Sequence, residues 1–366
     1  MEADYAIVGG GVVGLSVAWG LLRRGRRVIV IDGDDGSFRA SRGNFGLIWV
    51  QSKGKEQPRY ARWSQQSATA WADFAAQLQG NTGCKLALEQ RGGYDLHFSE
   101  ESLASTVAEY EALKRKLGGD YPYEVLDQSA LRREEPAIGP KVFGAILHHQ
   151  DGQVNPLKLL MYLADDVRRL GGQVLCGKRV TDVKKADMFA IHCADGTVVR
   201  AQKLVLAAGL GAAELGPKLG FKAPVRAQRG QLLITEKLPK LINRPSITAR
   251  QVAEGGIQIG ATEEEVGLDD GVTQKGVVAL ARDAIAAYPA LGRAQIVRSW
   301  GALRVLSPDG LPIYHQSALM PGAYLVTCHS GITLAPAHAF FLPDWLENTP
   351  AAPDLEVFSE NRFRVS

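Results

Sequence analysis

The sequence predicts an α/β fold in which a domain built on a parallel sheet is interrupted by a second, α+β domain with a mostly antiparallel sheet. Three observations lead to this prediction. The first 32 residues hold a complete strand–loop–helix–strand unit, which is the size of a βαβ element. A third buried strand, ending in small residues, comes only at 203–209. Amphipathic strands then follow at 226–261.

The remaining elements follow from apolar spacing and from turn residues. The segment 12–24 has helical spacing and ends at Gly25, which suits the position after a helix. Further helices are expected at 60–78, 99–117, 156–170, 274–288 and 332–346. Strands are expected at 5–8, 27–32, 93–98, 142–148, 173–176, 180–183, 189–193 and 322–327.

Composition excludes several function classes. The chain has 366 residues with 46% apolar content, enough to bury an ordinary core and long enough to favour two domains. The net charge is +3 and no block of like charge occurs, so neither nucleic acid nor an anionic membrane is an expected partner. No apolar run is long enough to cross a bilayer, and the acidic start lacks a signal-peptide pattern. We therefore expect a cytoplasmic protein with no integral membrane segment.

The four cysteines indicate reduced thiols. None forms a C-x-x-C pair or stands near a His cluster with zinc-like spacing, so no metal site is expected. The absence of any paired pattern is typical of a reducing compartment. These residues are Cys84, Cys176, Cys193 and Cys328.

A glycine pattern between the first strand and helix predicts a dinucleotide site. Gly9 allows a sharp turn, Gly11 lets a pyrophosphate approach the backbone, and Gly14 lets the helix pack closely on the strand. The start of the helix then offers unpaired N–H groups to the phosphates. Asp32, at the end of the second strand, suits ribose hydroxyls and disfavours the 2′-phosphate of NADP. A glycine-rich turn without a ligand is the alternative.

The strand at 204–209 bears on which dinucleotide is bound. Its small residues at the end would let a sheet edge approach the cofactor closely, although such a strand can also be ordinary core. Asp32 alone does not separate NAD from the ADP half of FAD. The second glycine-bearing strand adds to the FAD interpretation.

With these motifs, the chain resembles the D-amino-acid oxidase superfamily of FAD enzymes, in particular its glycine oxidase, sarcosine oxidase and heteromeric amine dehydrogenase members. The resemblance covers nearly the whole chain. It implies a Rossmann-like FAD-binding domain at 1–80, 140–220 and 301–366, and an inserted α+β substrate domain at 81–139 and 221–300. The motifs are the glycine loop with Asp32, then 41–46, 91–94, 151–156, 206–209, 300–312 and 328–336.

The resemblance implies a set of cofactor-binding residues. The segment 41–46 would lie along the pyrophosphate and the flavin, and 331–333, at the expected start of the last helix, would cap the pyrimidine edge of the ring. Independently, N–H groups at a helix start stabilise the negative charge of a reduced flavin. A plain helix cap by Ser330 is compatible with this role. The residues are Gly9, Gly11, Gly14, Asp32, Ser41, Asn44, Phe45, Gly46, Val180, Ala208, Gly209, Gly301, Arg304, Ser330, Gly331, Ile332 and Thr333.

Departures from the family pattern narrow the resemblance. Cys328 and Thr333 stand where many members have Gly, and the ending is closer to the β subunits of heteromeric D-hydroxyproline and opine dehydrogenases. No Cys lies between 300 and 312, where monomeric sarcosine oxidase attaches its flavin, so non-covalent FAD is expected. Gln258 replaces the Lys that assists oxygen in that oxidase. This replacement favours a dehydrogenase.

The implied reaction moves a hydride from the carbon beside an amine to flavin N5, giving an imine that water hydrolyses. Arg304 is the expected clamp for a substrate carboxylate, because its planar guanidinium can pair with both carboxylate oxygens. Arg250 is a weaker candidate on the same logic, and His329 is expected to line the active site. A structural or surface arginine is the alternative for Arg304.

Other polar residues are better explained without a catalytic role. His148 and His149 are adjacent on a strand and point to opposite faces, so a structural or solvated pair is expected. Lys53, Lys55 and Arg59 form a basic patch that is interpreted as a solvated face.

Three functions remain open at this stage. The first is the catalytic β subunit of a heteromeric FAD dehydrogenase that acts on an amino acid or secondary amine, such as D-hydroxyproline or an opine. Such an enzyme implies an α partner, with a γ partner as a further option, and FMN or an iron–sulfur cluster at or in a partner. The second is a self-contained oxidase that produces hydrogen peroxide. The third, a non-catalytic electron-transfer protein, is disfavoured by the intact Arg304 motif.

Overall fold

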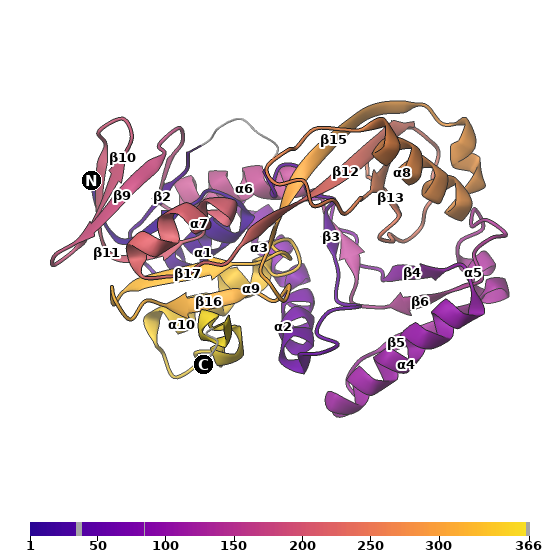
Figure 1. Ribbon diagram of the computed structural model, residues 1–366, viewed down its shortest axis with the longest axis horizontal. Helices are drawn as coiled ribbons and strands as arrows, with labels where there is room; N and C mark the ends of the chain where they lie inside the picture. The colour runs from indigo at the N-terminus through magenta and orange to yellow at the C-terminus, as the bar shows by residue number, and fades with distance from the viewer. Residues whose placement is uncertain (34–38, 84, 364–366) are drawn as a thin grey trace.

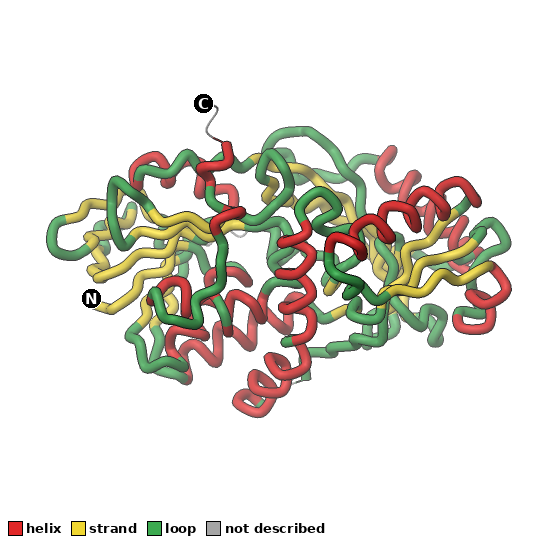
Figure 2. The backbone as a smooth tube through the Cα atoms, turned by 90° about the horizontal axis from the view of Figure 1, so that it is seen from below, coloured by secondary structure: helices red, strands yellow, loops and turns green. Residues whose placement is uncertain are grey.

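The computed structural model describes residues 1–33, 39–83 and 85–363. The chain forms two halves that lie side by side: a large sheet with its helices on the left of Figure 1, and two smaller sheets with their helices on the right. The view from below shows strands gathered in two groups with helices between and below them (Figure 2). The chain passes between the halves several times, as expected for an inserted domain.

The large sheet has eight strands, and its centre is parallel. Its order is β16-β17-β11-β1-β2-β8, with β10 and β9 added antiparallel beside the first part of β11. The parallel pairs join β1 to both β2 and β11, which places the expected βαβ unit in the middle of the sheet. The bounds are β1 (Glu2–Val8), β2 (Val28–Ile31), β8 (Gln173–Leu175), β9 (Val180–Lys185), β10 (Phe189–Cys193), β11 (Val198–Leu206), β16 (Ile313–Gln316) and β17 (Ala323–Thr327).

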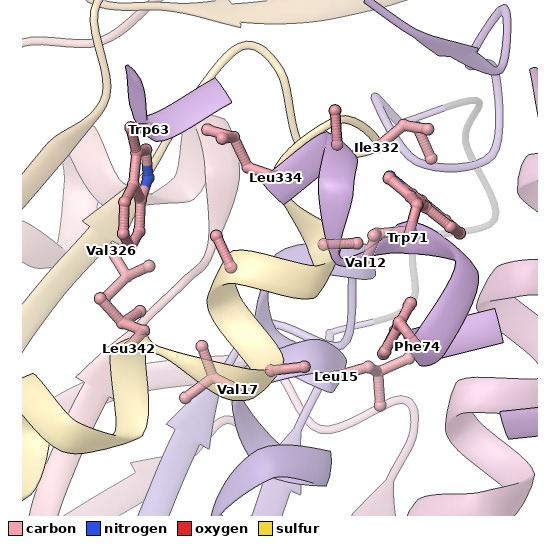
Figure 3. Packing of buried hydrophobic residues seen from close by; sticks show 14 of the residues in the cluster. Val12, Leu15, Val17, Trp63, Trp71, Phe74, Val326, Ile332, Leu334 and Leu342 are labelled. Carbon is pink, nitrogen blue, oxygen red and sulfur yellow. The ribbon is translucent and has the colours of Figure 1, made fainter. Parts of the chain in front are cut away.

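Helix α1 (Val12–Leu22) lies at the centre of the largest hydrophobic cluster. Ten of its residues are buried, and it packs against α6 (Pro156–Arg169) and against α9 (Ala335–Phe340). Figure 3 shows side chains of α1 meeting those of the C-terminal helices and of Trp71 and Phe74. Gly20 makes the contact with α9 possible, because a Cβ there would lie 2.0 Å from the carbonyl oxygen of Ala339.

Two helices that the sequence predicts as continuous are each broken. The expected helix 60–78 is α2 (Pro58–Thr69) followed by α3 (Trp71–Thr82), with the break at Ala70, where the fully buried Trp71 turns into the core. The expected helix 332–346 is α9 followed by α10 (Leu342–Glu347). Pro343 lies in the first turn of α10 and has no N–H to donate four residues back. Tertiary packing and this proline, rather than apolar spacing, set these boundaries.

The second half contains two antiparallel sheets. The four-stranded sheet has the order β13-β14-β12-β15, and the three-stranded sheet has the order β4-β6-β5. The sequence did not predict β5 (Tyr123–Asp127) or α5 (Gln128–Glu134), whose charged residues leave only Leu126 and Leu131 buried. The other bounds are β4 (Gly93–His97), α4 (Glu100–Lys116), β6 (Gly144–His148), β12 (Arg226–Lys237), β13 (Ala249–Gln251), β14 (Gly256–Gly260), α8 (Gln274–Ala287) and β15 (Ile296–Leu306).

Sheet pairing differs from the expected domain boundaries at two places. β6 lies inside 140–220 but pairs with β4 and β5 of the second half. β15 crosses the expected boundary at 301 and pairs with β12 along its whole length. The short strands β3 (Leu47–Ile48) and β7 (Gly152–Gln153) pair with each other near the junction of the two halves. Among the described residues, no helix is both long and apolar enough to cross a membrane.

Candidate active site

The glycine loop between β1 and α1 is tightly constrained by its own backbone. Gly9 has a φ of +116°, and a Cβ there would lie 2.3 Å from the carbonyl oxygen of Ala207. A Cβ on Gly14 would lie 2.0 Å from the carbonyl oxygen of Gly9. A Cβ on Gly11 would lie 3.0 Å from Ser41 Oγ. The loop therefore has the close approaches that the sequence predicts for a turn on which a pyrophosphate can rest.

Two polar side chains are held against this loop. Asp32, just after β2, accepts a hydrogen bond from the backbone N–H of Gly10 at 2.5 Å. Ser41 Oγ accepts the N–H of Val12 at 3.0 Å, at the first residue of α1. Ser41 therefore stands at the end of the helix where unpaired N–H groups gather. Residues 34–38, between these two side chains, lie outside the described residues.

The end of β11 reaches the same loop. The hypothetical Cβ of Gly9 also comes within 2.9 Å of Ala208 Cα, and Gly209 adopts a φ of +56° directly after it. The small residues expected to let a sheet edge approach the cofactor thus lie beside the glycine loop. Val180, expected near the adenine, begins β9 and is buried in a second hydrophobic cluster with Ile31.

The segment 44–46 leads from the glycine loop toward the second half. Asn44 Oδ1 accepts the N–H of Gly46 at 2.7 Å, which fixes a tight turn. Gly46 has a φ of +88°, and a Cβ there would lie 2.7 Å from an Nη atom of Arg250. The Arg250 guanidinium also lies 5.7 Å from the centre of the Phe45 ring. Two predicted cofactor residues, Phe45 and Gly46, therefore lie against a predicted catalytic arginine.

Arg250 is buried without a carboxylate partner among the described residues. It donates to Gln258 Oε1 at 3.0 and 2.7 Å, and more weakly to Gln153 and to the Val154 carbonyl. Burial lowers the pKa of Arg250 to about 9. Arg250 therefore contacts Gln258, the residue expected to replace a lysine. In this way a buried cation still lies beside the segment 44–46.

Arg304 lies on β15, in the second half. Its Nη1 donates to the Thr262 carbonyl at 2.8 Å and, more weakly, to the Gln228 side chain and the Arg229 carbonyl. All three acceptors are neutral, and within the described chain no carboxylate lies at ion-pair distance. Burial lowers the pKa of Arg304 from its ordinary value. A half-buried guanidinium with only neutral acceptors retains the charge needed to bind an anion.

Two further residues of this motif hold neighbouring segments in place. Trp300 Nε1 donates to the Gly43 carbonyl at 3.2 Å, which joins β15 to the segment 41–46. A Cβ on Gly301 would lie 2.4 Å from the carbonyl oxygen of Asp270. Gly301 therefore allows the loop after β14 to cross β15, a packing role that does not depend on a cofactor.

The C-terminal segment 330–333 meets the start of α1. A Cβ on Gly331 would lie 3.3 Å from the Val13 side chain, and Ile332 is buried in the core around α1. Thr333 Oγ1 accepts the Trp49 N–H at 3.0 Å, and the Thr333 carbonyl accepts the Ser67 hydroxyl at 2.7 Å. These contacts fix the segment between the glycine loop and the loop that follows β3.

The position of the last helix corrects one expectation. Residues 331–334 form a turn, and α9 begins only at Ala335, with Pro336 in its first turn. The expected start of the last helix at Ile332 is therefore wrong by three residues. Ser330 does not cap α9 with its side chain, because its hydroxyl accepts hydrogen bonds from Tyr60 and Lys53 instead.

The His329 side chain has solvent-accessible surface but is surrounded by much of the protein, including the charges of two cations. The protein around the ring lowers the pKa of His329 to about 3, first by burial of its charged form and then by the charges of Lys53 and Arg304. The ring is therefore neutral at physiological pH. Two cations from distant segments, Lys53 and Arg304, thus both act electrostatically on His329.

Lys53 departs from its predicted role. Lys55 and Arg59 form surface ion pairs with Glu109 and Asp354, as a solvated face requires. Lys53 instead donates to Ser330 Oγ and lies 5.7 Å from the centre of the Tyr60 ring. The interpretation of all three as one solvated face is wrong for Lys53. The sequence could not show that Lys53 differs from Lys55 and Arg59, because all three stand close together after the same loop.

Asp151 received no role of its own in the sequence analysis. Its side chain is fully buried, Oδ1 accepts the Val50 N–H at 2.5 Å, and Oδ2 has no hydrogen-bond partner in the described part of the chain. Burial raises the pKa of Asp151 to about 8, against the opposing charge of Lys53. The motif at 151–156 indicated a turn, but the carboxyl group also fixes the loop after β3.

The two histidines lie where the sequence predicts. His148 is buried against Tyr121, with ring centres 4.9 Å apart, whereas His149 is exposed and lies 3.0 Å from Glu124. Over residues 1–33, 39–83 and 85–363, no cluster of three His, Cys, Asp or Glu side chains could hold a metal ion. Cys176, Cys193 and Cys328 are free thiols, and Cys84 lies outside the described residues.

These contacts fit a bound dinucleotide. Three segments that are far apart in the sequence converge on the first turn of α1: the glycine loop, Ser41 and Gly331. At Gly9 and Gly14 a Cβ would collide with backbone carbonyl oxygens, so these glycines allow the strand, the turn and the start of α1 to pack closely, as in loops that bind a pyrophosphate. Asp32 lies at one side of this surface, and the cluster of Lys53, Arg304 and His329 lies toward the other half.

The comparisons with known proteins identify the family of the chain. Residues 4–345 match the family described as FAD dependent oxidoreductase (DAO). One opine oxidase subunit, from Rhizobium meliloti, is 38% identical over 367 residues, covering 99% of this chain and 98% of that protein. The corresponding opine oxidase subunit from Agrobacterium tumefaciens is also 38% identical, covering 100% and 98%.

Among solved structures, the crystal structure of glycine oxidase from Geobacillus kaustophilus superposes with a TM-score of 0.92 at 26% identity, covering 100% of both chains. The fold confirms the α/β prediction with a Rossmann-like FAD-binding domain and an inserted substrate domain. The chain therefore belongs to the DAO family of FAD-dependent oxidoreductases, which act on the C–N bonds of amines.

Proposed function

We propose that this chain is the catalytic subunit of a heteromeric FAD-dependent dehydrogenase that oxidises the C–N bond of an N-substituted or cyclic amino acid. The observation that carries the proposal is Arg304, whose half-buried guanidinium has only neutral acceptors in the described structure. The similarity to two proteins named as opine oxidase subunits supports both the substrate class and the existence of partner subunits. D-Hydroxyproline and opines are the candidate substrates.

The proposed residues form two groups, which would bind the two ends of the cofactor. Gly9, Gly11 and Gly14 would hold the pyrophosphate, with Ser41 at the start of α1 and Asp32 at a ribose. The other proposed contacts surround the flavin end or the adenine. They are Asn44, Phe45, Gly46, Val180, Ala208, Gly209, Gly301, Arg304, Ser330, Gly331, Ile332 and Thr333.

Bound FAD supplies the hydride acceptor, and the protein positions the amine. Arg304 binds the substrate carboxylate through paired hydrogen bonds and so fixes the direction of the reacting C–H bond. His329 is neutral, because its pKa is about 3, and can therefore accept or donate a hydrogen bond without repelling a substrate ammonium. The amine must lose a proton before hydride transfer, and water would accept that proton.

The experiment that tests this function is an anaerobic titration of the purified, FAD-loaded chain. Amino acids with an N-substituent should remove the visible absorbance of the oxidised flavin, whereas Arg304→Met should retain FAD but react at least about a hundredfold more slowly. Arg298, exposed on the same strand, gives the matched control Arg298→Met. Equal rates in the wild type and Arg304→Met would contradict the proposal.

A self-contained oxidase remains the second candidate, and Arg250 favours it. The dehydrogenase prediction rested on Gln258 in place of a lysine, but Arg250 brings a buried cation into contact with that glutamine. A cation near the reduced flavin stabilises the charge that forms when oxygen takes an electron. Rapid hydrogen peroxide production by the isolated chain, lost in Arg250→Met, would favour the oxidase.

The partner subunits are a separate part of the proposal. We propose an α partner, with a γ partner as a further option, an FMN or iron–sulfur cluster at or in a partner that receives the electrons, and a cytoplasmic assembly. Co-expression with candidate partner chains and size-exclusion chromatography would test it. A chain that transfers electrons to an artificial dye equally well with and without its partners would argue against a required partner.

A further inference from the structure

Gly230 lies against the side chain of Arg304. The two residues stand on neighbouring antiparallel strands, β12 and β15, where Gly230 is paired with Ala302 and Arg304 with Gln228. A Cβ on Gly230 would lie 2.8 Å from Nη2, 2.9 Å from Cζ and 2.9 Å from Nη1 of Arg304. Because these three distances are nearly equal, the Cβ would stand against the flat face of the guanidinium. Arg304 therefore lies flat on the bare backbone of Gly230.

The protein uses only one end of the Arg304 guanidinium. Nη1 donates to the Thr262 carbonyl at 2.8 Å and, at 3.4 Å each, to the Gln228 side chain and the Arg229 carbonyl. Within the described residues, Nε and Nη2 have no acceptor. These two groups form one edge of the guanidinium, and such an edge can pair with both oxygens of a carboxylate. The fold thus fixes Nη1 and leaves the Nε–Nη2 edge for a ligand.

The Thr262 carbonyl is fixed by Glu264, two residues further on. The Glu264 carboxylate accepts a hydrogen bond from Arg229 Nη2 at 2.7 Å and another from the Thr262 hydroxyl. Gln231 Nε2 donates to the same carboxylate at 2.7 Å. The main chains of Glu264 and Arg229 also exchange two hydrogen bonds, at 2.9 and 3.0 Å. Arg229 itself is buried. Glu264 therefore ties the segment after β14 to strand β12.

We propose that Gly230 and Glu264 are positioning residues for Arg304, which hold its guanidinium flat on β12 so that the Nε–Nη2 edge meets the carboxylate of the bound amine. The inference rests on the proposed function, in which Arg304 binds that carboxylate. Gly230 acts by lacking a side chain. Glu264 acts through the Thr262 carbonyl, which is the acceptor nearest to Nη1. Both residues thereby set the direction of the clamp without contacting the substrate.

A positioning role at Gly230 can be separated from a role in stability. The φ of Gly230 is not positive, so alanine is compatible with its place in the strand. The atoms that a new Cβ would meet belong to the far end of a long, flexible side chain rather than to the backbone. Gly230→Ala should therefore displace the guanidinium of Arg304 and leave the fold and the bound FAD unchanged.

The test measures the binding of unreactive carboxylates to the FAD-loaded chain. The probes are pyrrole-2-carboxylate, a planar analogue of a cyclic amino acid, together with benzoate and acetate. Their dissociation constants come from the perturbation of the flavin spectrum. For the probes that the wild type binds, Arg304→Met should weaken binding about a hundredfold, Gly230→Ala about tenfold and Glu264→Gln about fivefold.

Matched control variants show whether the effect is specific. Gly80→Ala adds a methyl group in α3, where no atom lies within 4 Å of the new Cβ. Glu214→Gln removes one partner of an exposed ion pair with Arg179. Neither control should change the binding of a probe. The melting temperature and the dissociation constant of FAD, measured for every variant, report on the fold and on the cofactor site separately.

A double-mutant cycle shows whether the two residues act through Arg304. If they do, Gly230→Ala and Glu264→Gln cause no further loss of probe binding when Arg304 is already replaced by methionine. A residue that contacts the ligand itself, or that only supports the fold, would cause the same loss in both backgrounds. If Glu264→Gln does not fold, the cycle with Gly230→Ala decides the question alone.

Three results would overturn the inference. The first is a Gly230→Ala variant that binds the probes as the wild type does. The second is an equal loss in the wild-type and Arg304→Met backgrounds, and the third is a loss of FAD in parallel with the loss of the probe. The proposed function fails separately, if the wild type binds none of the three probes or if Arg304→Met binds them as tightly as the wild type.

Discussion

The glycine loop and the cluster of Lys53, Arg304 and His329 are built in opposite ways. The loop is defined by missing side chains: its glycines approach neighbouring atoms so closely that a Cβ would come within 2.0 to 3.0 Å of one of them. The cluster is defined by side chains from three distant segments, of which Lys53 and Arg304 make one or a few hydrogen bonds each. The loop has little tolerance for change, whereas the cluster can change its ligand specificity by single substitutions.

The largest expected effect is at Gly14. In Gly14→Val the new Cβ would lie 2.0 Å from the carbonyl oxygen of Gly9, so α1 must move away from β1. We expect a loss of about 3 kcal/mol or more in the free energy of unfolding and loss of bound FAD. Thermal unfolding and the flavin content of the purified protein measure both. Gly80→Ala, in α3 with no atom within 4 Å of the new Cβ, is the control and should be neutral or stabilising.

The next effect concerns Asp151 and pH. Its pKa is about 8 in the folded protein against the ordinary value of 3.8, so the folded state favours the protonated carboxyl group. The stabilisation is complete below about pH 4 and is lost as the pH rises through about 8, with a change of the order of a few kcal/mol. Asp151→Asn should remove this part of the pH dependence. A wild-type unfolding profile that matches the variant between these values would contradict the burial of the charged form.

A smaller effect, confined to activity, is expected at Arg304. Arg304→Lys keeps the charge but loses the paired hydrogen bonds, so kcat/KM should fall by about tenfold, while the dissociation constant of FAD and the melting temperature stay unchanged. Steady-state kinetics with a dye acceptor measure the change. A loss of FAD that accompanies the loss of activity would show that Arg304 serves the fold or the cofactor rather than the substrate.

The smallest effect is expected at Asp32. Asp32→Asn retains an oxygen for the Gly10 N–H but removes the charge offered to a ribose. We expect FAD to bind more weakly by about 1 kcal/mol, with no change in the preference among amines. Equilibrium titration of the apoprotein with FAD gives the affinity. Tighter binding of FAD by the variant would place the ribose elsewhere.

The contrast between the two regions also explains what the sequence could predict. The glycine loop is formed by neighbouring residues: strand, turn, helix and Asp32 follow one another within the first 32 residues. Each structural requirement of the loop calls for a particular residue type, which can be recognised in the sequence. Arg304 could be singled out because the spacing around it matches a family pattern. Both predictions rest on local sequence.

The features that the sequence could not predict depend on contacts between distant segments. Lys53 has the same local setting as Lys55, and only the fold turns its ammonium toward Ser330. The break at Ala70 places Trp71 in the core, which no local signal indicates. The break before α10 is different: the prediction of one helix at 332–346 overlooked Pro343, a proline four residues after Ala339 that leaves the Ala339 carbonyl without its helical partner.

The most direct test of the central claim is anaerobic reduction of the FAD-loaded chain by an N-substituted amino acid, followed together with the appearance of the oxo acid from imine hydrolysis. The account predicts that the flavin loses its visible absorbance and that one oxo acid forms for each flavin reduced. It also predicts that Arg304→Met binds FAD normally but does neither at a comparable rate. A folded, FAD-loaded chain that no amine reduces would contradict the account.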